Sequence, residues 1–176
     1  MLSAPSRLLM LAVLLVACSP MVPSSLPAQQ PAPSPRDIEA SVLEGAARAR
    51  RDAGVPPLTV HERLSRAALG HATELARRGE LDHTSEDPAQ RTLVHRVRIA
   101  GVSSYSRLAE NLASVLNPRV EPGEQVIRLW LDSPGHRANL LDGASDRTGV
   151  GAALATDGQW YVVQVFGAGL VPASSP

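Results

Sequence analysis

The sequence predicts an α+β fold in which a β-sheet lies between two layers of helices. Two apolar runs, 149–156 and 159–166, flank Asp157-Gly158, and such a pair is a strong signal for a hairpin with a two-residue loop. The second run is apolar on both faces, so both faces should be covered. One face carries Trp160, Val162 and Phe166, and the other carries Tyr161, Val163 and Val165. Several segments with helical periodicity are available to supply this cover.

Two long helices are predicted before the sheet. In 36–53, apolar residues recur at helical spacing, and Gly54 ends the segment. In 62–78, one face is apolar and Gly79 lies just past the last periodic residue. His71 falls on that apolar face, so we interpret it as a half-buried packing residue.

Shorter elements are predicted in the middle of the chain. We expect a short helix over 90–100 and an extended segment over 108–115. A further helix is expected over 123–132, because Pro122 suits the start of a helix. Ser133-Pro134-Gly135 is expected to end it. The residues of this helix expected to face the core are Val126, Leu129 and Trp130.

The N-terminus has the features of a bacterial export signal. The apolar run Leu8–Ala17 follows Arg7 and is too short to span a bilayer, which needs about 20 apolar residues. It leads into Leu15-Val16-Ala17-Cys18, which resembles the lipobox of bacterial lipoproteins, where the chain is cut before the cysteine and the thiol is acylated. We therefore expect a signal peptide over 1–17 and lipidation of Cys18. The alternative is ordinary secretion with an incidental cysteine.

Composition sets the boundaries of the folded part. Residues 18–35 hold six prolines among small and polar residues, which predicts a disordered tether. The stretch 36–169 is long enough for one domain with its own core, and 170–176 is expected to be a disordered tail. No cysteine follows Cys18, so no disulfide can form within the domain. The 17 basic and 17 acidic residues form no basic stripe, so nucleic acid is not an expected partner.

Two histidines and one glutamate lie in settings that suit chemistry. His83 follows the second predicted helix, Glu110 lies within the extended segment, and His136 follows the helix 123–132. Such a set can bind zinc with a position open for water, act as acid and base without metal, or simply form hydrogen bonds. The positions form no local motif such as H-E-x-x-H, so the residues alone leave these alternatives open. His95 has no evident partner and is expected at the surface.

Several short motifs follow one another in a specific order from Arg36 to Gly167. They are Leu64-x-x-Ala67-Ala68-x-x-His71-Ala72, His83-Thr84, Glu110-Asn111-Leu112, Trp130-x-x-Ser133-Pro134-Gly135-His136-Arg137-x-Asn139-Leu140-Leu141, Gly149-Val150-Gly151 and Tyr161-Val162-Val163-Gln164-Val165-Phe166-Gly167. This order resembles the CAP superfamily of cysteine-rich secretory, antigen 5 and pathogenesis-related proteins, and most of all its bacterial SCP-like extracellular branch. The resemblance implies a single α-β-α sandwich domain.

The resemblance also implies a cleft lined by two histidines and two acidic residues. His83, Glu110 and His136 match three of these places, with Ala109 replacing the glycine before the glutamate. Ser133 stands where the second acidic residue usually lies. We therefore expect a cleft of His83, Glu110, Ser133 and His136, in which three residues are left as ligands for a divalent metal such as zinc: His83, Glu110 and His136.

Three functions are compatible with this pattern. The first is an exported, lipid-anchored protein of the cell envelope that binds a ligand or partner without catalysis, because family members are proposed to bind sterols, fatty acids or other lipids. The second is a hydrolase, with zinc-activated water or with Ser133 as nucleophile, His136 as base and Glu110 orienting it. The third is a structural protein with a vestigial cleft. We favour the first, with the membrane and a lipid or small apolar ligand as partners, and assign no catalytic residue.

Overall fold

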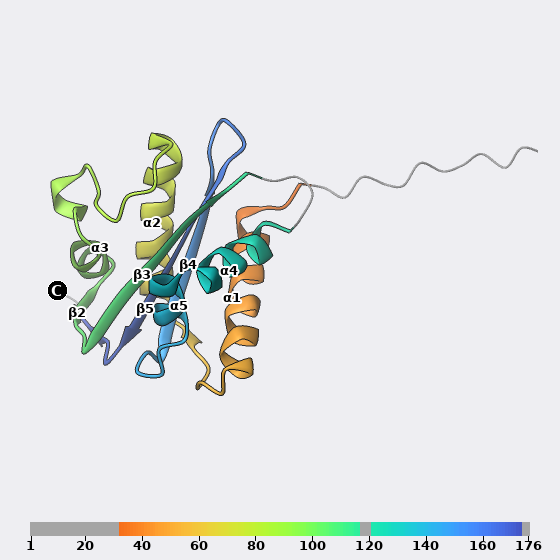
Figure 1. The fold of residues 1–176 in the computed structure, drawn as a ribbon. Coiled ribbons are helices and arrows are strands. Elements are labelled where there is room, and N and C mark those ends of the chain that lie inside the picture. The colour runs from red at the N-terminus through yellow and green to blue at the C-terminus, as the bar shows by residue number, and fades with distance from the viewer. Residues whose placement is uncertain (1–31, 117–120, 174–176) are drawn as a thin grey trace, which may run out of the picture. The chain divides into compact units, whose positions relative to one another are not determined.

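The computed structural model describes residues 32–116 and 121–173 (Figure 1). The elements are α1 (Pro35–Asp52), β1 (Thr59–Val60), α2 (Glu62–Arg78), the 3-10 turn η1 (Pro88–Gln90), α3 (Leu93–Ile99), β2 (Val102–Ser104), β3 (Arg107–Val115), α4 (Pro122–Asp132), α5 (Pro134–Leu140), β4 (Arg147–Leu154), β5 (Trp160–Ala168) and β6 (Val171–Pro172). The predicted signal peptide, Cys18 and the tether up to residue 31 lie outside the described residues. Among the residues that are described, no helix is long and apolar enough to cross a membrane.

A four-stranded sheet in the order β1-β4-β5-β3 forms the centre of the domain (Figure 1). The long strand β5 pairs antiparallel with β4 on one side and with β3 on the other. The short strand β1 adds a parallel pairing to β4. In the β3–β5 pair, Glu110 lies opposite Val165 and Asn111 lies opposite Gln164. Because side chains alternate along a strand, Glu110 and Asn111 point to opposite faces of the sheet at its β3 edge.

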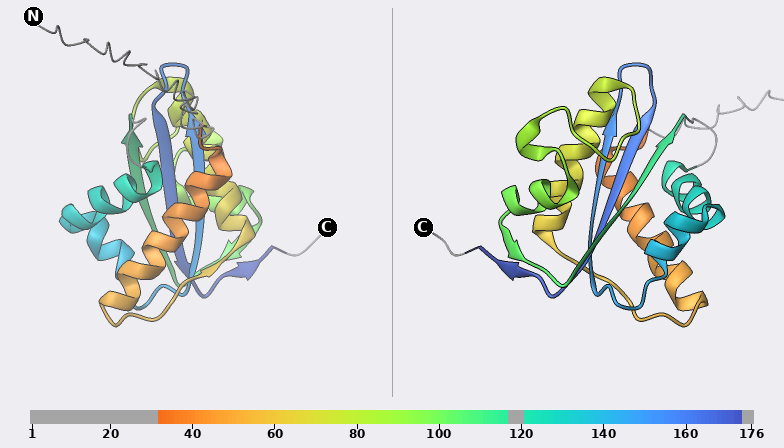
Figure 2. Two further views of the ribbon diagram at one scale, coloured as in Figure 1. Left: turned by 90° about the vertical axis from the view of Figure 1, so that its right-hand side faces the viewer. Right: turned by 60° about the vertical axis from the view of Figure 1, so that its left-hand side comes forward.

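Helices cover both faces of the sheet, as the two apolar faces of 159–166 predicted. Helices α2 and α3 lie on one face, and α1, α4 and α5 lie on the other (Figure 2). Trp160, Val162 and Phe166 pack in the core with α1, α4 and α5. Tyr161, Val163 and Val165 pack in the second core with α2 and α3. The predicted α-β-α sandwich is confirmed.

Local signals fix the starts and ends of the two long helices. Helix α1 begins after Ser34, whose hydroxyl accepts a hydrogen bond from the backbone of Asp37 while the Asp37 side chain accepts one from the backbone of Ser34. Helix α2 has the predicted bounds. It ends at Gly79, which adopts the left-handed conformation with φ of 73° that favours glycine.

Three helical predictions differ from the structure. The predicted helix 90–100 is divided into η1 and α3, and α3 begins only after Thr92, whose side chain caps it. The Ser133-Pro134-Gly135 segment ends α4 as predicted, but Pro134 is also the first residue of α5, a position where the missing N–H costs nothing. Leu129 was expected in the core and is 49% exposed, while Ile127 is buried instead.

The predicted hairpin is confirmed, with a loop of three residues rather than two. Ala155 donates its N–H to the carbonyl of Gln159 at 2.8 Å, and Gly158 donates to Ala155 at 3.0 Å. Gly158 has a φ of 86°, which suits a type I turn followed by a left-handed glycine. The loop therefore consists of residues 156–158, one more than the Asp-Gly pair implies.

The prediction of a disordered tail over 170–176 is wrong for the first residues of that segment. Val171–Pro172 forms β6, which pairs antiparallel with β2. Ala173 then donates its N–H to the carbonyl of Gly101 at 2.8 Å. This short pairing is held by main-chain hydrogen bonds and by Ser103, whose hydroxyl donates to β6 carbonyls, so side-chain periodicity could not reveal it. Residues 174–176 lie outside the described part.

Candidate functional site

Glu110 and His83 form the centre of the candidate site. The Glu110 side chain, on β3, is 4% exposed, whereas the His83 side chain, in the loop after α2, is 59% exposed. His83 Nδ1 lies 3.0 Å from Glu110 Oε1. The loop is shaped by Asp82, whose carboxylate accepts hydrogen bonds from the N–H and the hydroxyl of Thr84. Two of the residues predicted from the sequence are therefore in direct contact.

Arg96 of α3 completes this contact and was not predicted. Its Nη2 donates to both carboxylate oxygens of Glu110, at 2.9 and 2.8 Å. The guanidinium also donates to backbone carbonyls of the loop, including that of His83. A sequence signal was present, because Leu93, Arg96 and Val97 share one face of a helix that is otherwise apolar on that side. A charged residue on such a face needs a buried partner.

The charges around Glu110 determine its protonation. Burial alone raises the pKa of Glu110, but the hydrogen bond with His83 and the positive charge of Arg96 outweigh burial and hold that pKa below its usual value. In turn, the hydrogen bond with Glu110 raises the pKa of His83. Glu110 is therefore ionised at neutral pH, and it orients His83 with Nδ1–H directed at the carboxylate.

His71 of α2 supports the same loop. It is fully buried rather than half-buried, and its Nε2 lies 2.9 Å from the carbonyl oxygen of Asp82. Burial, followed by the positive charge of Arg96, lowers the pKa of His71. The neutral ring therefore donates its Nε2–H to Asp82 and helps to hold the residue that precedes His83. His95 is exposed, as predicted.

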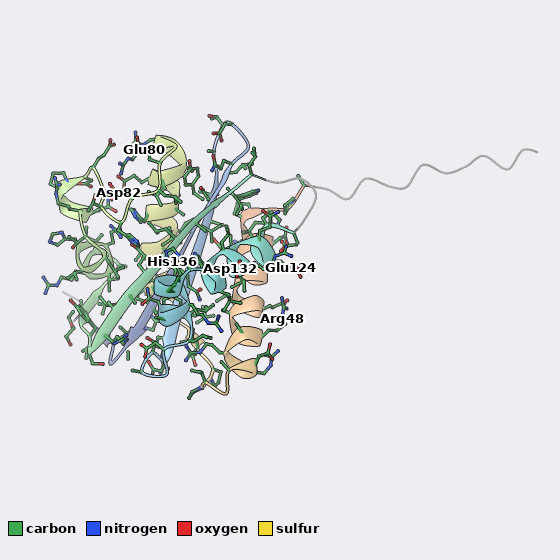
Figure 3. The ribbon with its side chains drawn as sticks, in the orientation of Figure 1. Arg48, Glu80, Asp82, Glu124, Asp132 and His136 are labelled. Atoms are coloured by element: carbon green, nitrogen blue, oxygen red, sulfur yellow. The ribbon has the colours of Figure 1, made fainter. Side chains whose placement is uncertain are left out.

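Helix α5 brings His136 to the same edge of the sheet, where Figure 3 marks it beside β3. Asn111, the neighbour of Glu110, donates from Nδ2 to the carbonyl of His136 at 2.9 Å. Asn139 donates to the Asn111 side chain at 3.0 Å and so fixes α5 on β3. Burial, followed by the positive charge of His83, lowers the pKa of His136.

The triad required by a serine hydrolase is not formed by these contacts. Such a triad needs Ser133, His136 and Glu110 to act as nucleophile, base and orienting acid. The carboxylate of Glu110 is bonded instead to His83 and Arg96. Ser133 joins α4 to α5, and its side chain makes no hydrogen bond at the start of α5.

The residues at this site do not fit a metal ion. Within residues 32–116 and 121–173, no group of three or more His, Cys, Asp or Glu side chains is arranged to hold one. Arg96 covers both oxygens of Glu110, and Ser133 supplies no second carboxylate. The expected zinc ligands His83, Glu110 and His136 are therefore not presented together as a three-ligand centre.

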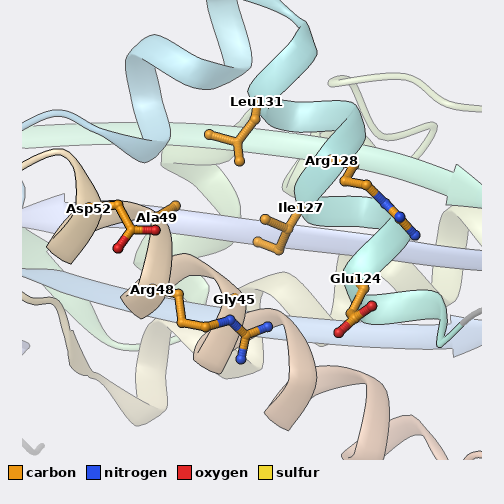
Figure 4. A pocket seen from close by; sticks show the side chains of 8 residues that line it. All are labelled: Gly45, Arg48, Ala49, Asp52, Glu124, Ile127, Arg128 and Leu131. Atoms are coloured by element: carbon orange, nitrogen blue, oxygen red, sulfur yellow. The ribbon is translucent and has the colours of Figure 1, made fainter.

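A separate groove of about 260 Å³ lies between α1 and α4 (Figure 4). It is lined by four small or apolar residues and four charged residues: Gly45, Ala49, Ile127, Leu131, Arg48, Asp52, Glu124 and Arg128. The two helices approach closely here, because a Cβ on Gly45 would lie only 2.6 Å from Cγ1 of Ile127. The groove therefore combines an apolar lining with charges of both signs.

The fold and the site define a class of protein: an α-β-α sandwich whose sheet carries a buried glutamate at one edge, hydrogen-bonded to a loop histidine. The family model described as "CAP: Cysteine-rich secretory protein family" matches residues 44–166. The chain therefore belongs to the CAP family, as the order of its motifs predicted.

Individual relatives agree with this assignment. The chain is 29% identical over 113 residues to the "Uncharacterized protein YkwD" of Bacillus subtilis (strain 168), an alignment that covers 64% of this chain and 41% of YkwD. An outer surface protein of Borrelia burgdorferi is similar in structure, with a TM-score of 0.66 and 22% identity over 76% of this chain and 93% of that one. An extracellular protein containing an SCP domain from Bacillus anthracis has a TM-score of 0.63 and 23% identity, covering 76% of this chain and 41% of that one. The chain thus spans less than half of YkwD.

Proposed function

We propose that this chain is an exported, lipid-anchored CAP protein that binds a ligand or partner at the cell envelope without catalysis. The observation that carries this proposal is the engagement of Glu110. Its carboxylate is 4% exposed and accepts hydrogen bonds from both Arg96 and His83. A carboxylate held in this way is a weak proton acceptor, since its pKa is lowered and its side chain is buried beneath Arg96 and His83.

The accessible groups at the site suit recognition. His83 is largely exposed and His136 is half-buried, while Ser133 lies one turn before His136. Imidazole and hydroxyl groups donate and accept hydrogen bonds, so they favour a polar or anionic group of a ligand. In this proposal His83, Ser133 and His136 contact that group, and Glu110 holds the His83 ring in place.

The groove between α1 and α4 supports an apolar ligand. Its volume of about 260 Å³ is just below the usual range of about 300–1,000 Å³ for ligand pockets, so it suits a small molecule or part of a chain. Its lining also holds two basic and two acidic side chains, so the head group of such a ligand would meet charges of both signs. In this proposal the groove is a second ligand-binding surface, separate from the one formed by His83, Ser133 and His136.

Export and anchoring rest on the N-terminal sequence. Two of the structural relatives are named as an outer surface protein and an extracellular protein. In this proposal Cys18 carries the lipid anchor, and the Pro-rich segment behind it connects the anchor to the domain. Stable anchoring needs two or more acyl chains, which a bacterial lipoprotein cysteine carries.

The test is to extract the protein from its own envelope in mild detergent and identify co-purifying small molecules by native mass spectrometry. Four proteins are compared: wild type, Leu131→Trp, Leu129→Trp and the double variant His83→Ala/His136→Ala. Leu131 lines the groove, whereas Leu129 is exposed on the same helix and serves as the matched control.

We expect a ligand on wild type and Leu129→Trp. Its loss in Leu131→Trp alone assigns it to the groove, and its loss in the double variant alone assigns it to the histidines. A wild-type protein without ligand contradicts the proposal. So does hydrolysis of an envelope peptide or ester that disappears in the double variant.

A further inference from the structure

Arg96 supplies a permanent positive charge at the position where a metal ion would bind Glu110. Nη2 of Arg96 lies 2.9 and 2.8 Å from the two carboxylate oxygens. The side chains of Arg96 and Glu110 are only 1% and 4% exposed, so water does not separate or screen them effectively. A guanidinium carries a delocalised positive charge, so it neutralises the carboxylate that it contacts.

The same guanidinium fixes the position of His83. Arg96 donates to the carbonyl oxygen of His83 at 3.3 Å from Nη1 and at 3.2 Å from Nη2, and to that of Gln90 at 3.1 Å. The His83 ring meets the Glu110 carboxylate at 3.0 Å. Moving Arg96 aside would therefore release the loop and leave the buried carboxylate with the His83 ring as its remaining partner, which is unfavourable.

Within the described residues, no hydrogen bond or ion pair joins a second carboxylate to Glu110, its charged partners being Arg96 and His83. The groups in contact with its carboxylate are Arg96 and His83, both bases, while the acids Glu74 and Asp82 act on His71 and His83 rather than on Glu110 itself. Ser133 stands where an acidic residue would add a second negative charge. A zinc ion would therefore bring two positive charges to a site whose one carboxylate is already neutralised.

We infer that the guanidinium of Arg96 is the resident cation of this site, takes the place of a metal ion at Glu110, and makes the site independent of metal. Arg96 is a positioning residue, because it acts on a ligand only through Glu110 and His83. The inference goes beyond the proposed function, since it holds whichever ligand the protein binds.

Isothermal titration with zinc chloride tests this inference on the full mature chain. The variants are Ser133→Glu, Arg96→Met and the double variant Arg96→Met/Ser133→Glu. Arg98→Met is the matched control, because Arg98 lies on the same helix and is exposed. We expect wild type, Ser133→Glu and Arg98→Met to show no zinc binding at micromolar concentration. The double variant should bind about 10–100-fold more tightly than Ser133→Glu, because the competing cation is gone.

Two results would overturn the inference. The first is micromolar zinc binding by wild type that His136→Ala weakens. The second is equally tight zinc binding by Ser133→Glu and the double variant, which would mean that the missing acid, and not Arg96, keeps metal out. If circular dichroism shows that Arg96→Met fails to fold, the Ser133→Glu variant alone decides. Zinc binding by Ser133→Glu then contradicts the inference, and the absence of zinc binding by Ser133→Glu supports the inference.

Discussion

Replacing Gly151 by alanine tests directly how α2 packs on the sheet. The Gly149-Val150-Gly151 segment of β4 lies directly under α2, and a Cβ built on Gly151 would collide with the backbone of Leu69 and lie 2.6 Å from the carbonyl carbon of Ala68. Ordinary contacts begin at 3.4 Å. In Gly151→Ala, helix and strand must therefore separate by about 1 Å, and backbone cannot rotate away as a side chain can.

The expected cost of Gly151→Ala is about 3 kcal/mol, at the upper end of the usual range for overpacking. That loss is a large share of the stability of a domain of this size and lowers the melting temperature by roughly 10 °C. Urea unfolding followed by circular dichroism measures the change. The matched control is Gly70→Ala, because Gly70 lies within α2 and a Cβ there meets nothing within 4 Å.

Gly70→Ala is expected to stabilise the domain by about 0.5–1 kcal/mol, since alanine is the better helix former. The comparison removes any general effect of replacing glycine by alanine. If Gly151→Ala were as stable as wild type, α2 would not lie directly on β4, and the packing described above would be wrong.

Three further predictions concern the anchor, the core and the site. Cys18→Ser should abolish acylation and normal processing, as seen by mass spectrometry of the membrane fraction; an unacylated wild type cut elsewhere would contradict the lipobox. Phe166→Ala should destabilise the domain by about 3–5 kcal/mol in thermal unfolding, because Phe166 is fully buried; an unchanged melting temperature would contradict its place in the core. The pKa of His83 is raised by its hydrogen bond with Glu110, so its stabilisation is complete below its ordinary pKa of about 6.5 and disappears as pH rises through the raised pKa. The difference in unfolding free energy between wild type and His83→Asn should therefore be larger just below pH 6.5, where Glu110 is still ionised, than at alkaline pH, and a difference that grows with pH across this range would refute this sign.

The arrangement of the core could be predicted from β5 because both its faces are apolar. Trp160 and Tyr161 had to point in opposite directions, and each needed a helical layer. Elements without such a pattern were missed. Strand β6 is held by main-chain hydrogen bonds and by the hydroxyl of Ser103, and α5 begins at Pro134, within the segment predicted to end a helix.

The site was predicted only in part, and the reason is physical. His83 and Glu110 were recognised from the order of motifs, and their contact is present at 3.0 Å. Arg96 belongs to no recognised motif, and its role depends on α3 packing against the edge of the sheet. Its place on an apolar helical face was the one local signal, because a charged residue at such a position implies a buried partner of opposite charge.

The most direct test of whether Arg96 takes the place of a metal ion at Glu110 is a crystal structure. The crystals are grown in the presence of zinc, and diffraction data are collected at the zinc absorption edge. If Arg96 is the resident cation, its Nη2 remains within hydrogen-bonding distance of both oxygens of Glu110, with no anomalous peak beside that carboxylate. A peak about 2.0–2.2 Å from Glu110, His83 and His136, with Arg96 displaced, would contradict it.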